Sequence, residues 1–420
     1  VRGKKGDSRG LSGNEGDSAG HHRHLERRRT ETGEYIDPMP YCKHLLKDSK
    51  APVGSLIGIY PIQGKGVVNG SSHKKLLAIG NLKQPVHAWG EIYTGISAKD
   101  YMDGTSNFYG VHSVTLYVNS VQVFNSTTDK VLPDENRMIN GFTDYEELTR
   151  TRRLIMRSYK LPGNRLRLLH PNENRGAVTI DEERDYHFRY VLEDNFGNRR
   201  TYQFIVKGKR QDIPEYKPEA NEMLYWNRTN VIQKPGMELV VPRYYVYEDV
   251  PLRTDMRGDS SHIAFDYILD AGRTPIHSYC DLSIGLRHMP VADTTKYYIV
   301  QKAGKWRSSM GGKYANGWIK TRVRSLGTFS VDVDTIAPQI TPIGQGGWRT
   351  SRNIRFRIKD MESGIGSYKV YIDGKFVLFG LKKGILVIQD PEKVKKGVSH
   401  KLEVTVTDQC GNMTRKEYKF

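Results

Sequence analysis

Two histidines separated by one residue, His22 and His24, have the spacing of a metal-ligand pair. Side chains of a β-strand alternate between two faces, so both imidazoles can reach one ion or one water molecule. A zinc site takes three or four ligands, and only these two histidines have that spacing. The pair therefore has two interpretations: part of a zinc site, or a solvated basic strand end, because His21, Arg23 and Arg27 surround it.

A second group of candidate residues is acidic and recurs near the ends of turns. Its members are Asp100, Asp103, Asp194, Asp360, Glu362 and Asp408. Paired carboxylates near a hairpin can bind calcium. Aspartate also caps turns through its side chain, and no D-x-D-x-D spacing is present. The pattern therefore favours turn caps over a calcium site.

Aromatic residues gather near Gly311 and Gly312, where flat apolar rings could stack on sugars. They are Tyr297, Tyr298, Trp306, Tyr314 and Trp318. Rings of this kind more often fill the core of a β-sandwich, and the core interpretation is the one we favour.

The surroundings of the histidine pair resemble a known family. Residues 5–26 read KGDSRGLSGNEGDSAGHHRHLE, and residues 35–41 read YIDPMPY. This order is similar to the end of the catalytic domain in lysostaphin-type zinc metallopeptidases, bacterial endopeptidases that cut peptide bonds of peptidoglycan. In that family a G-D hairpin leads into an H-x-H strand and then into an I-D-P turn.

The resemblance implies zinc as the cofactor, with His24 as a metal ligand and His22 as a catalytic histidine beside the zinc-bound water. The implied chemistry is attack of a zinc-polarised water on a peptide carbonyl. The family places its other two metal ligands in an H-x-x-x-D segment upstream of the hairpin, where only residues 1–4 lie here. We therefore expect this polypeptide alone to lack appreciable peptidase activity.

Composition predicts several domains and attraction to polyanions. The 420 residues suffice for two to four domains, and the formal net charge is +18. No nucleic-acid motif is present, no apolar run is long enough for a transmembrane helix, and the first residues lack the apolar core of a signal peptide. The three cysteines, Cys42, Cys280 and Cys410, specify no disulfide framework. The resemblance implies peptidoglycan or another anionic envelope polymer as partner, and a periplasmic or secreted location in the cell envelope.

An internal repeat predicts the fold class. Strand, D-x-x-G-N turn and strand occur near 186–206 and again near 400–420, and an Ala-Pro pair precedes each unit. These repeats resemble bacterial immunoglobulin-like modules. We expect an all-β chain of tandem immunoglobulin-like β-sandwiches, preceded by the C-terminal remnant of a β-rich peptidase domain.

The expected domains are as follows. The peptidase fragment covers 1–45, a sandwich with a charged, helix-like insertion at 134–158 covers 51–208, a further sandwich covers 209–335, and the last sandwich covers 336–420.

Two functions follow from this sequence. The first is the C-terminal portion of a zinc endopeptidase that acts on peptidoglycan. The alternative is a non-enzymatic protein of tandem immunoglobulin-like modules, used for envelope binding or adhesion.

Overall fold

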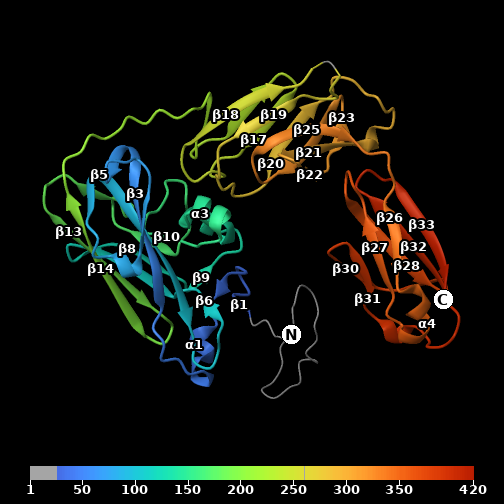
Figure 1. Ribbon diagram of the computed structural model, residues 1–420, viewed down its shortest axis with the longest axis horizontal. Coiled ribbons are helices and arrows are strands. Elements are labelled where there is room, and N and C mark those ends of the chain that lie inside the picture. Colours follow the sequence, from blue (N-terminus) through green and yellow to red (C-terminus); the bar gives the residue numbers. More distant parts are fainter. Residues whose placement is uncertain (1–25, 260) are drawn as a thin grey trace. The chain divides into compact units, whose positions relative to one another are not determined.

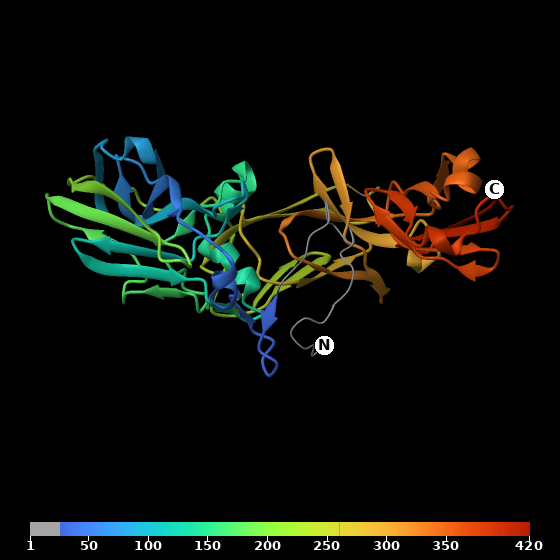
Figure 2. The ribbon, with the colours of Figure 1, turned by 90° about the horizontal axis from the view of Figure 1, so that it is seen from below.

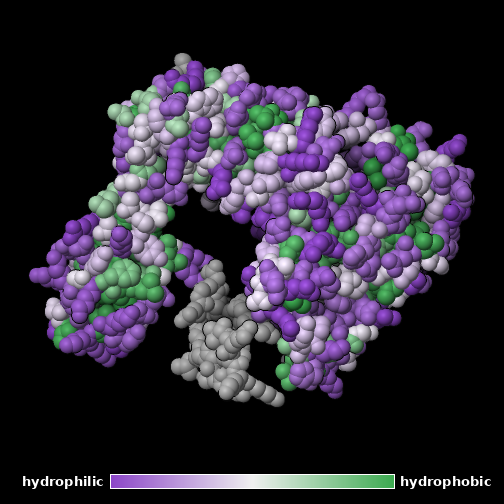
Figure 3. All heavy atoms as spheres, turned by 180° about the vertical axis from the view of Figure 1, so that it is seen from behind, coloured by the Kyte–Doolittle hydropathy of each residue, from purple (hydrophilic) through white to green (hydrophobic). Residues whose placement is uncertain are grey.

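The computed structural model describes residues 26–259 and 261–420, which form two compact units that divide between Tyr216 and Lys217. In each unit nearly all regular structure is β-strand, and the coiled segments of the ribbon are short (Figures 1 and 2). The all-β prediction is confirmed. Hydrophilic side chains cover most of the face seen in Figure 3.

The first unit contains one large sheet and a small one, and we call its part at 51–208 the first sandwich. Its strands are β1 (Arg27–Arg28), β2 (Tyr35–Ile36), β3 (Val53–Val68), β4 (Lys75–Ala78), β5 (Val86–Tyr101), β6 (Phe108–Tyr109), β7 (Ser113–Val118), β8 (Val121–Thr127), β9 (Lys130–Val131), β10 (Met156–Arg157), β11 (Leu169–Pro171), β12 (Val178–Ile180), β13 (Asp185–Glu193) and β14 (Arg199–Gly208). Its helices are α1 (Met39–Cys42), α2 (Ile139–Phe142) and α3 (Tyr145–Thr151), with short 3-10 turns at Lys43–Leu45, Ile79–Asn81 and Asn136–Met138.

The large sheet follows the order β11-β8-β7-β13-β14-β5-β3-β4, and β6, β10 and β12 also pair with β5. In β13 every second residue is buried, so Tyr186, Phe188, Tyr190 and Leu192 face the core. The Tyr190 hydroxyl lies 2.7 Å from the hydroxyl of Thr94 and 2.8 Å from that of Ser158, which satisfies this polar group inside the core.

The insertion is helical where the sequence predicts it. Asp144 caps α3 by accepting a hydrogen bond from the Glu147 amide at 3.1 Å. Lys74 and the Tyr60 hydroxyl both donate to the other oxygen of Asp144, at 2.7 and 3.0 Å. The capping residue therefore also anchors the insertion to the sheet.

The second unit contains two separate pairs of facing sheets. The strands of the first pair are β15 (Glu222–Leu224), β16 (Asn230–Lys234), β17 (Met237–Val241), β18 (Val250–Arg257), β19 (Asp266–Asp270), β20 (Cys280–Gly285), β21 (Tyr297–Ala303), β22 (Trp306–Ser309), β23 (Lys313–Ala315), β24 (Trp318–Val323) and β25 (Gly327–Val333). They form the sheets β15-β18-β19-β25-β21-β22 and β16-β17-β20-β24-β23, which enclose one core; a 3-10 turn lies at Thr294–Lys296.

The last sandwich has its own core. Its strands are β26 (Gln339–Ile343), β27 (Arg355–Lys359), β28 (Ile365–Ile372), β29 (Lys375–Phe376), β30 (Phe379–Lys382), β31 (Ile385–Ile388), β32 (Lys401–Asp408) and β33 (Met413–Lys419), with helix α4 (Trp348–Ser351) and 3-10 turns at Gln345–Gly347 and Pro391–Lys393. The sheets are β26-β27-β31-β30 and β29-β28-β32-β33.

A buried imidazole gives the last sandwich a pH dependence. His400 is 7% exposed; its Nδ1 lies 2.6 Å from Asp373 Oδ2, and its Nε2 lies 2.8 Å from the Lys395 carbonyl. Both ring nitrogens face acceptors, so the imidazolium is the form that satisfies them. Burial lowers the pKa of His400, but these hydrogen bonds outweigh it and the net pKa is raised, while the hydrogen bond from His400 lowers the pKa of Asp373.

We therefore expect the last sandwich to lose stability as the pH rises above about 6.5 and through the raised pKa of His400. A histidine whose pKa is raised by folding stabilises the folded state fully at pH values below its unfolded pKa of about 6.5. This contribution is lost as the pH rises through the folded pKa. Asp373, whose pKa is lowered by folding, stabilises the folded state at pH values above its unfolded pKa of about 3.9. That contribution is lost as the pH falls through the folded pKa. Thermal unfolding of the full chain at several pH values checks this, with His400→Gln expected to flatten the profile and exposed His170→Gln to leave it unchanged. The same slope in both variants would refute the assignment.

Candidate functional site

The predicted catalytic His22 and the predicted zinc ligand His24 lie outside the described residues. Their assignment stays a prediction. The structure does describe the segment that follows them, from Glu26 through the closing turn to Tyr41.

This segment is attached to the first sandwich by strand pairing and by the buried Glu34, which forms an ion pair with Arg167. Strand β2 pairs with β9 through Tyr35↔Val131 and Ile36↔Lys130, and the Asp37 amide donates to the Asp129 carbonyl at 2.8 Å. The side chains of the turn therefore meet those of the sandwich, and a pocket forms between them.

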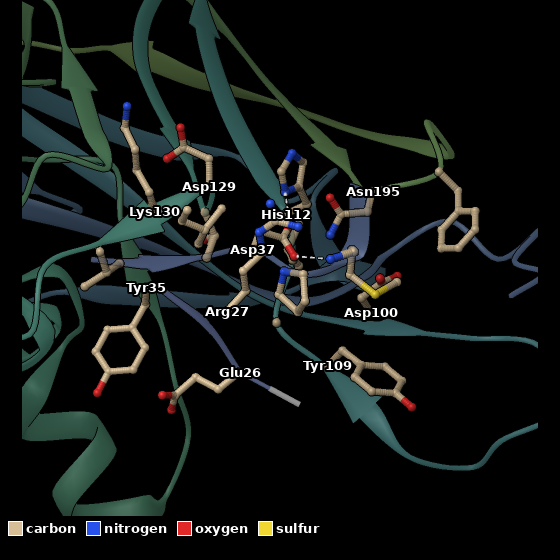
Figure 4. A pocket seen from close by; sticks show the side chains of 18 of the residues that line it. Glu26, Arg27, Tyr35, Asp37, Asp100, Tyr109, His112, Asp129, Lys130 and Asn195 are labelled. Atoms are coloured by element: carbon tan, nitrogen blue, oxygen red, sulfur yellow. Dashed lines mark hydrogen bonds and ion pairs between the residues drawn. The ribbon is translucent and has the colours of Figure 1, made fainter. Parts of the chain in front are cut away.

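The pocket lies beside the hairpin formed by β1 and β2, and we call it the hairpin pocket. It has a volume of about 450 Å³ (Figure 4). Its lining includes apolar side chains such as Ile36, Met39 and Val131, together with three other kinds. The acidic ones are Glu26, Asp37, Asp48, Asp100 and Asp129; the basic ones are Arg27, His112 and Lys130; the aromatic ones are Tyr35, Tyr109 and Phe196.

Several buried polar atoms of this lining lack hydrogen-bond partners. They are His112 Nδ1, Asp48 Oδ2 and Asp100 Oδ1. The nearest charged group to His112 Nδ1 is Asp37 Oδ2, at 3.7 Å, which is beyond hydrogen-bond length, and the two side chains lie together in Figure 4. Asp100 is buried, and this burial, followed by the charges of Asp194 and Asp48, raises its pKa to about 6.

The acidic candidates form two groups of three. Asp48, Asp100 and Asp194 each offer one oxygen, and these oxygens lie within 4.8 Å of one another; Asp334, Asp360 and Asp408 do the same. We call them the first and the second triad. The turn-capping interpretation is also confirmed for Asp194 and Asp408, which accept hydrogen bonds from the amides of Asn198 and Asn412 at 2.9 and 2.8 Å.

The sequence reasoning missed one member of each triad and included two residues that do not belong. Asp103 accepts a hydrogen bond from Ser49, and Glu362 accepts one from Tyr298. The missed members, Asp48 and Asp334, open the same pattern, D-x-x-A-P, before each Ala-Pro pair. That shared pattern was the available signal.

The aromatic group divides between core and surface. Tyr297 and Tyr298 are buried, whereas Trp306 is 81% exposed. The core interpretation is therefore correct for Tyr297 and Tyr298 and wrong for Trp306 and Tyr314, which is also exposed, while Trp318 is half-buried.

The cysteines are free thiols, as expected without a disulfide framework. Burial raises the pKa of Cys280 to about 12 and that of Cys410 to about 11. Neither thiol is prepared for nucleophilic chemistry at neutral pH.

Across the described residues, no helix combines the length and the apolar character needed to cross a membrane.

Comparisons with known proteins give one family match, which covers part of the chain. Residues 221–334, the range of strands β15 to β25, match the family model described as Zu5-like domain. No curated protein sequence matches the chain.

Three solved structures that are similar to this chain are remote ones. A Ca²⁺-stabilized adhesin with which an Antarctic bacterium binds ice is 11% identical, with 86% of this chain and 98% of that chain covered and a TM-score of 0.15. A 1.5-MDa bacterial ice-binding adhesin is 10% identical, with 79% and 89% covered and a TM-score of 0.13. The Bacteroides ovatus protein SGBP-B, in complex with a mixed-linkage heptasaccharide, is 12% identical, with 78% and 62% covered and a TM-score of 0.13. Similarity at this level carries no argument about function. Residues 221–334 are similar to a Zu5-like domain, and no family is assigned to the whole chain.

Proposed function

We propose that residues 26–420 form the non-enzymatic binding and spacing region of a cell-envelope protein, and that the hairpin pocket holds a peptide-bearing wall polymer. One observation carries the proposal: the buried His112 Nδ1 has no hydrogen-bond partner and belongs to a pocket that is also lined by acidic, basic and aromatic side chains. Buried polar atoms are almost always hydrogen-bonded, so a pocket that contains such an exception is suited to a polar ligand or ordered water. A volume of about 450 Å³ is in the range of ligand sites.

The lining indicates the chemistry of the ligand. Arg27, His112 and Lys130 can bind carboxylates of a ligand, and Asp37 and Asp129 can bind its amines. The aromatic rings can pack against its apolar side chains. The stem peptides of peptidoglycan carry all three kinds of group. The choice of peptidoglycan rests on the resemblance of residues 5–41 to the lysostaphin-type family.

Retention of the full chain on purified peptidoglycan tests this proposal. We expect Tyr109→Ala and His112→Ala to reduce the retained fraction about tenfold, because each removes a group that faces the ligand. Trp306→Ala is the matched control, since it removes a more exposed ring from a different sandwich. Washing at high ionic strength removes retention that depends only on the net charge of +18.

Two results would contradict the pocket as the binding site. One is retention that the Tyr109 and His112 variants keep and the Trp306 variant loses, which would place binding on the exposed ring of β22. The other is no retention of the unaltered chain after the high-salt wash.

A second candidate function is the zinc endopeptidase itself, with this chain as its C-terminal portion. The observation that favours it is the match of residues 5–26 and 35–41 to the family's hairpin, H-x-H strand and I-D-P turn. An H-x-x-x-D segment in the same reading frame upstream of Val1 would support this candidate. A start codon and signal peptide directly before Val1 would rule it out.

A further inference from the structure

We propose that each acidic triad binds one calcium ion, so that the chain holds two: one at Asp48, Asp100 and Asp194, the other at Asp334, Asp360 and Asp408. The two triads are built in the same way in two sandwiches of different sequence. In each, one aspartate lies in the segment before the sandwich, one lies at the end of a strand, and one opens the D-x-x-G-N turn.

The hydrogen bonds around the two triads also correspond. Asn198 donates its side-chain amide to Asp194 Oδ2 at 2.7 Å and to the Asp48 carbonyl at 3.2 Å. Asn412 donates to Asp408 Oδ2 at 2.8 Å and to the Asp334 carbonyl at 3.0 Å. In both sandwiches one asparagine thus holds two members of the triad in place, as second-shell groups orient metal ligands.

An independent sign of a missing partner is present in the first triad. Asp100 is 7% exposed, and its Oδ1 has no hydrogen-bond partner. Asp48 Oδ2, in the same triad, is buried and also lacks one. Buried carboxylate oxygens left in this state are costly unless a cation or water meets them.

No lysine or arginine side chain among the described residues neutralises the carboxylates of the triads. Among the described residues no lysine or arginine forms an ion pair with any of the six aspartates, although the chain has an excess of 18 positive charges. Three carboxylates within 4.8 Å of one another repel, and a divalent cation removes that repulsion.

Calcium fits this donor set better than the other common metals. The triads offer only oxygen ligands, which excludes a preference for zinc or copper. Calcium also accepts irregular oxygen sites completed by carbonyls and water, whereas magnesium requires near-ideal octahedral geometry.

The position of the triads gives the ions a mechanical role. Asp334 directly follows β25, the last strand of the preceding sandwich, while Asp360 and Asp408 belong to the last one. An ion there ties the connecting segment to the last sandwich. The ion at the first triad does the same for the segment that leads from the hairpin pocket into β3.

The test uses the full chain, stripped with a chelator and then equilibrated with about 1 mM calcium, a concentration suited to extracellular sites. We expect two bound ions per chain by atomic spectroscopy, and one in Asp100→Asn or Asp360→Asn. The matched controls Asp185→Asn and Glu392→Gln remove exposed carboxylates of the same two sandwiches and keep both ions.

Thermal unfolding separates lost binding from failed folding. In chelator, Asp100→Asn is expected to melt at or above the temperature of the unaltered chain, because the substitution removes repulsion. With calcium, the order reverses. Three results would overturn the assignment: an unaltered chain that binds no calcium, triad variants that keep two ions, and an equal response to magnesium. If only one of the two triad variants loses an ion, the site of the variant that keeps both ions is overturned.

Discussion

Trp348→Ala is expected to unfold the last sandwich at temperatures where the rest of the chain stays folded. Trp348 is fully buried, and its indole N–H donates to the Ile343 carbonyl at 2.9 Å. Its ring packs edge-on against Phe356 and Phe420, with centroid distances of 5.0 and 5.7 Å. Removing a buried tryptophan costs about 3–5 kcal/mol, which is much of the stability of a typical small domain.

Hydrogen exchange of the β32 amides, followed by mass spectrometry on the full chain, measures this loss. Trp306→Ala is the control: the same substitution at an exposed ring should cost less than about 0.5 kcal/mol. Trp348→Phe should recover part of the protection, because it restores ring packing but not the indole hydrogen bond. Unchanged β32 protection in Trp348→Ala would show that the ring does not support this core.

Arg167→Ala is expected to release the β1–β2 hairpin from the first sandwich and to lower the stability of the first unit by about 2 kcal/mol. Arg167 donates to Glu34 at 2.7 Å and to Glu135 at 2.8 Å, and both glutamates are buried. Without the arginine, the buried Glu135 loses its ion-pair partner, and the buried Glu34 keeps only Arg29, at 3.3 Å. The expected loss is below that for a fully buried ion pair, because Arg167 is itself about half exposed.

Exchange of the β2 and β9 amides reports the release. Arg199→Ala, which removes an exposed pair with Glu193, is the control and should cost less than about 1 kcal/mol. Arg167→Lys should be intermediate, because an ammonium cannot reach both glutamates in the way that the planar guanidinium does. Equal effects of the Arg167 and Arg199 substitutions would mean that the hairpin is held by its backbone pairing alone.

Local patterns in the sequence were enough to predict the fold class and the repeat. Alternation of apolar and polar residues in β13 and β32 marks half-buried strands, and each D-x-x-G-N segment forms a turn with glycine at positive φ, +92° at Gly197 and +80° at Gly411. These signals depend on neighbours a few residues apart. They need no knowledge of tertiary contacts.

The candidate site depended on contacts that the sequence does not reveal. The hairpin pocket brings Asp37 to His112 across 75 positions, and the first triad joins Asp48 to Asp194 across 146. The sequence by itself determined that Asp100, Asp194, Asp360 and Asp408 sit at turns and strand ends, because that placement is local. Only the tertiary structure decided that each group gains a third aspartate and that Asp100 is buried without a partner for one oxygen, because packing of distant segments sets burial and charge spacing.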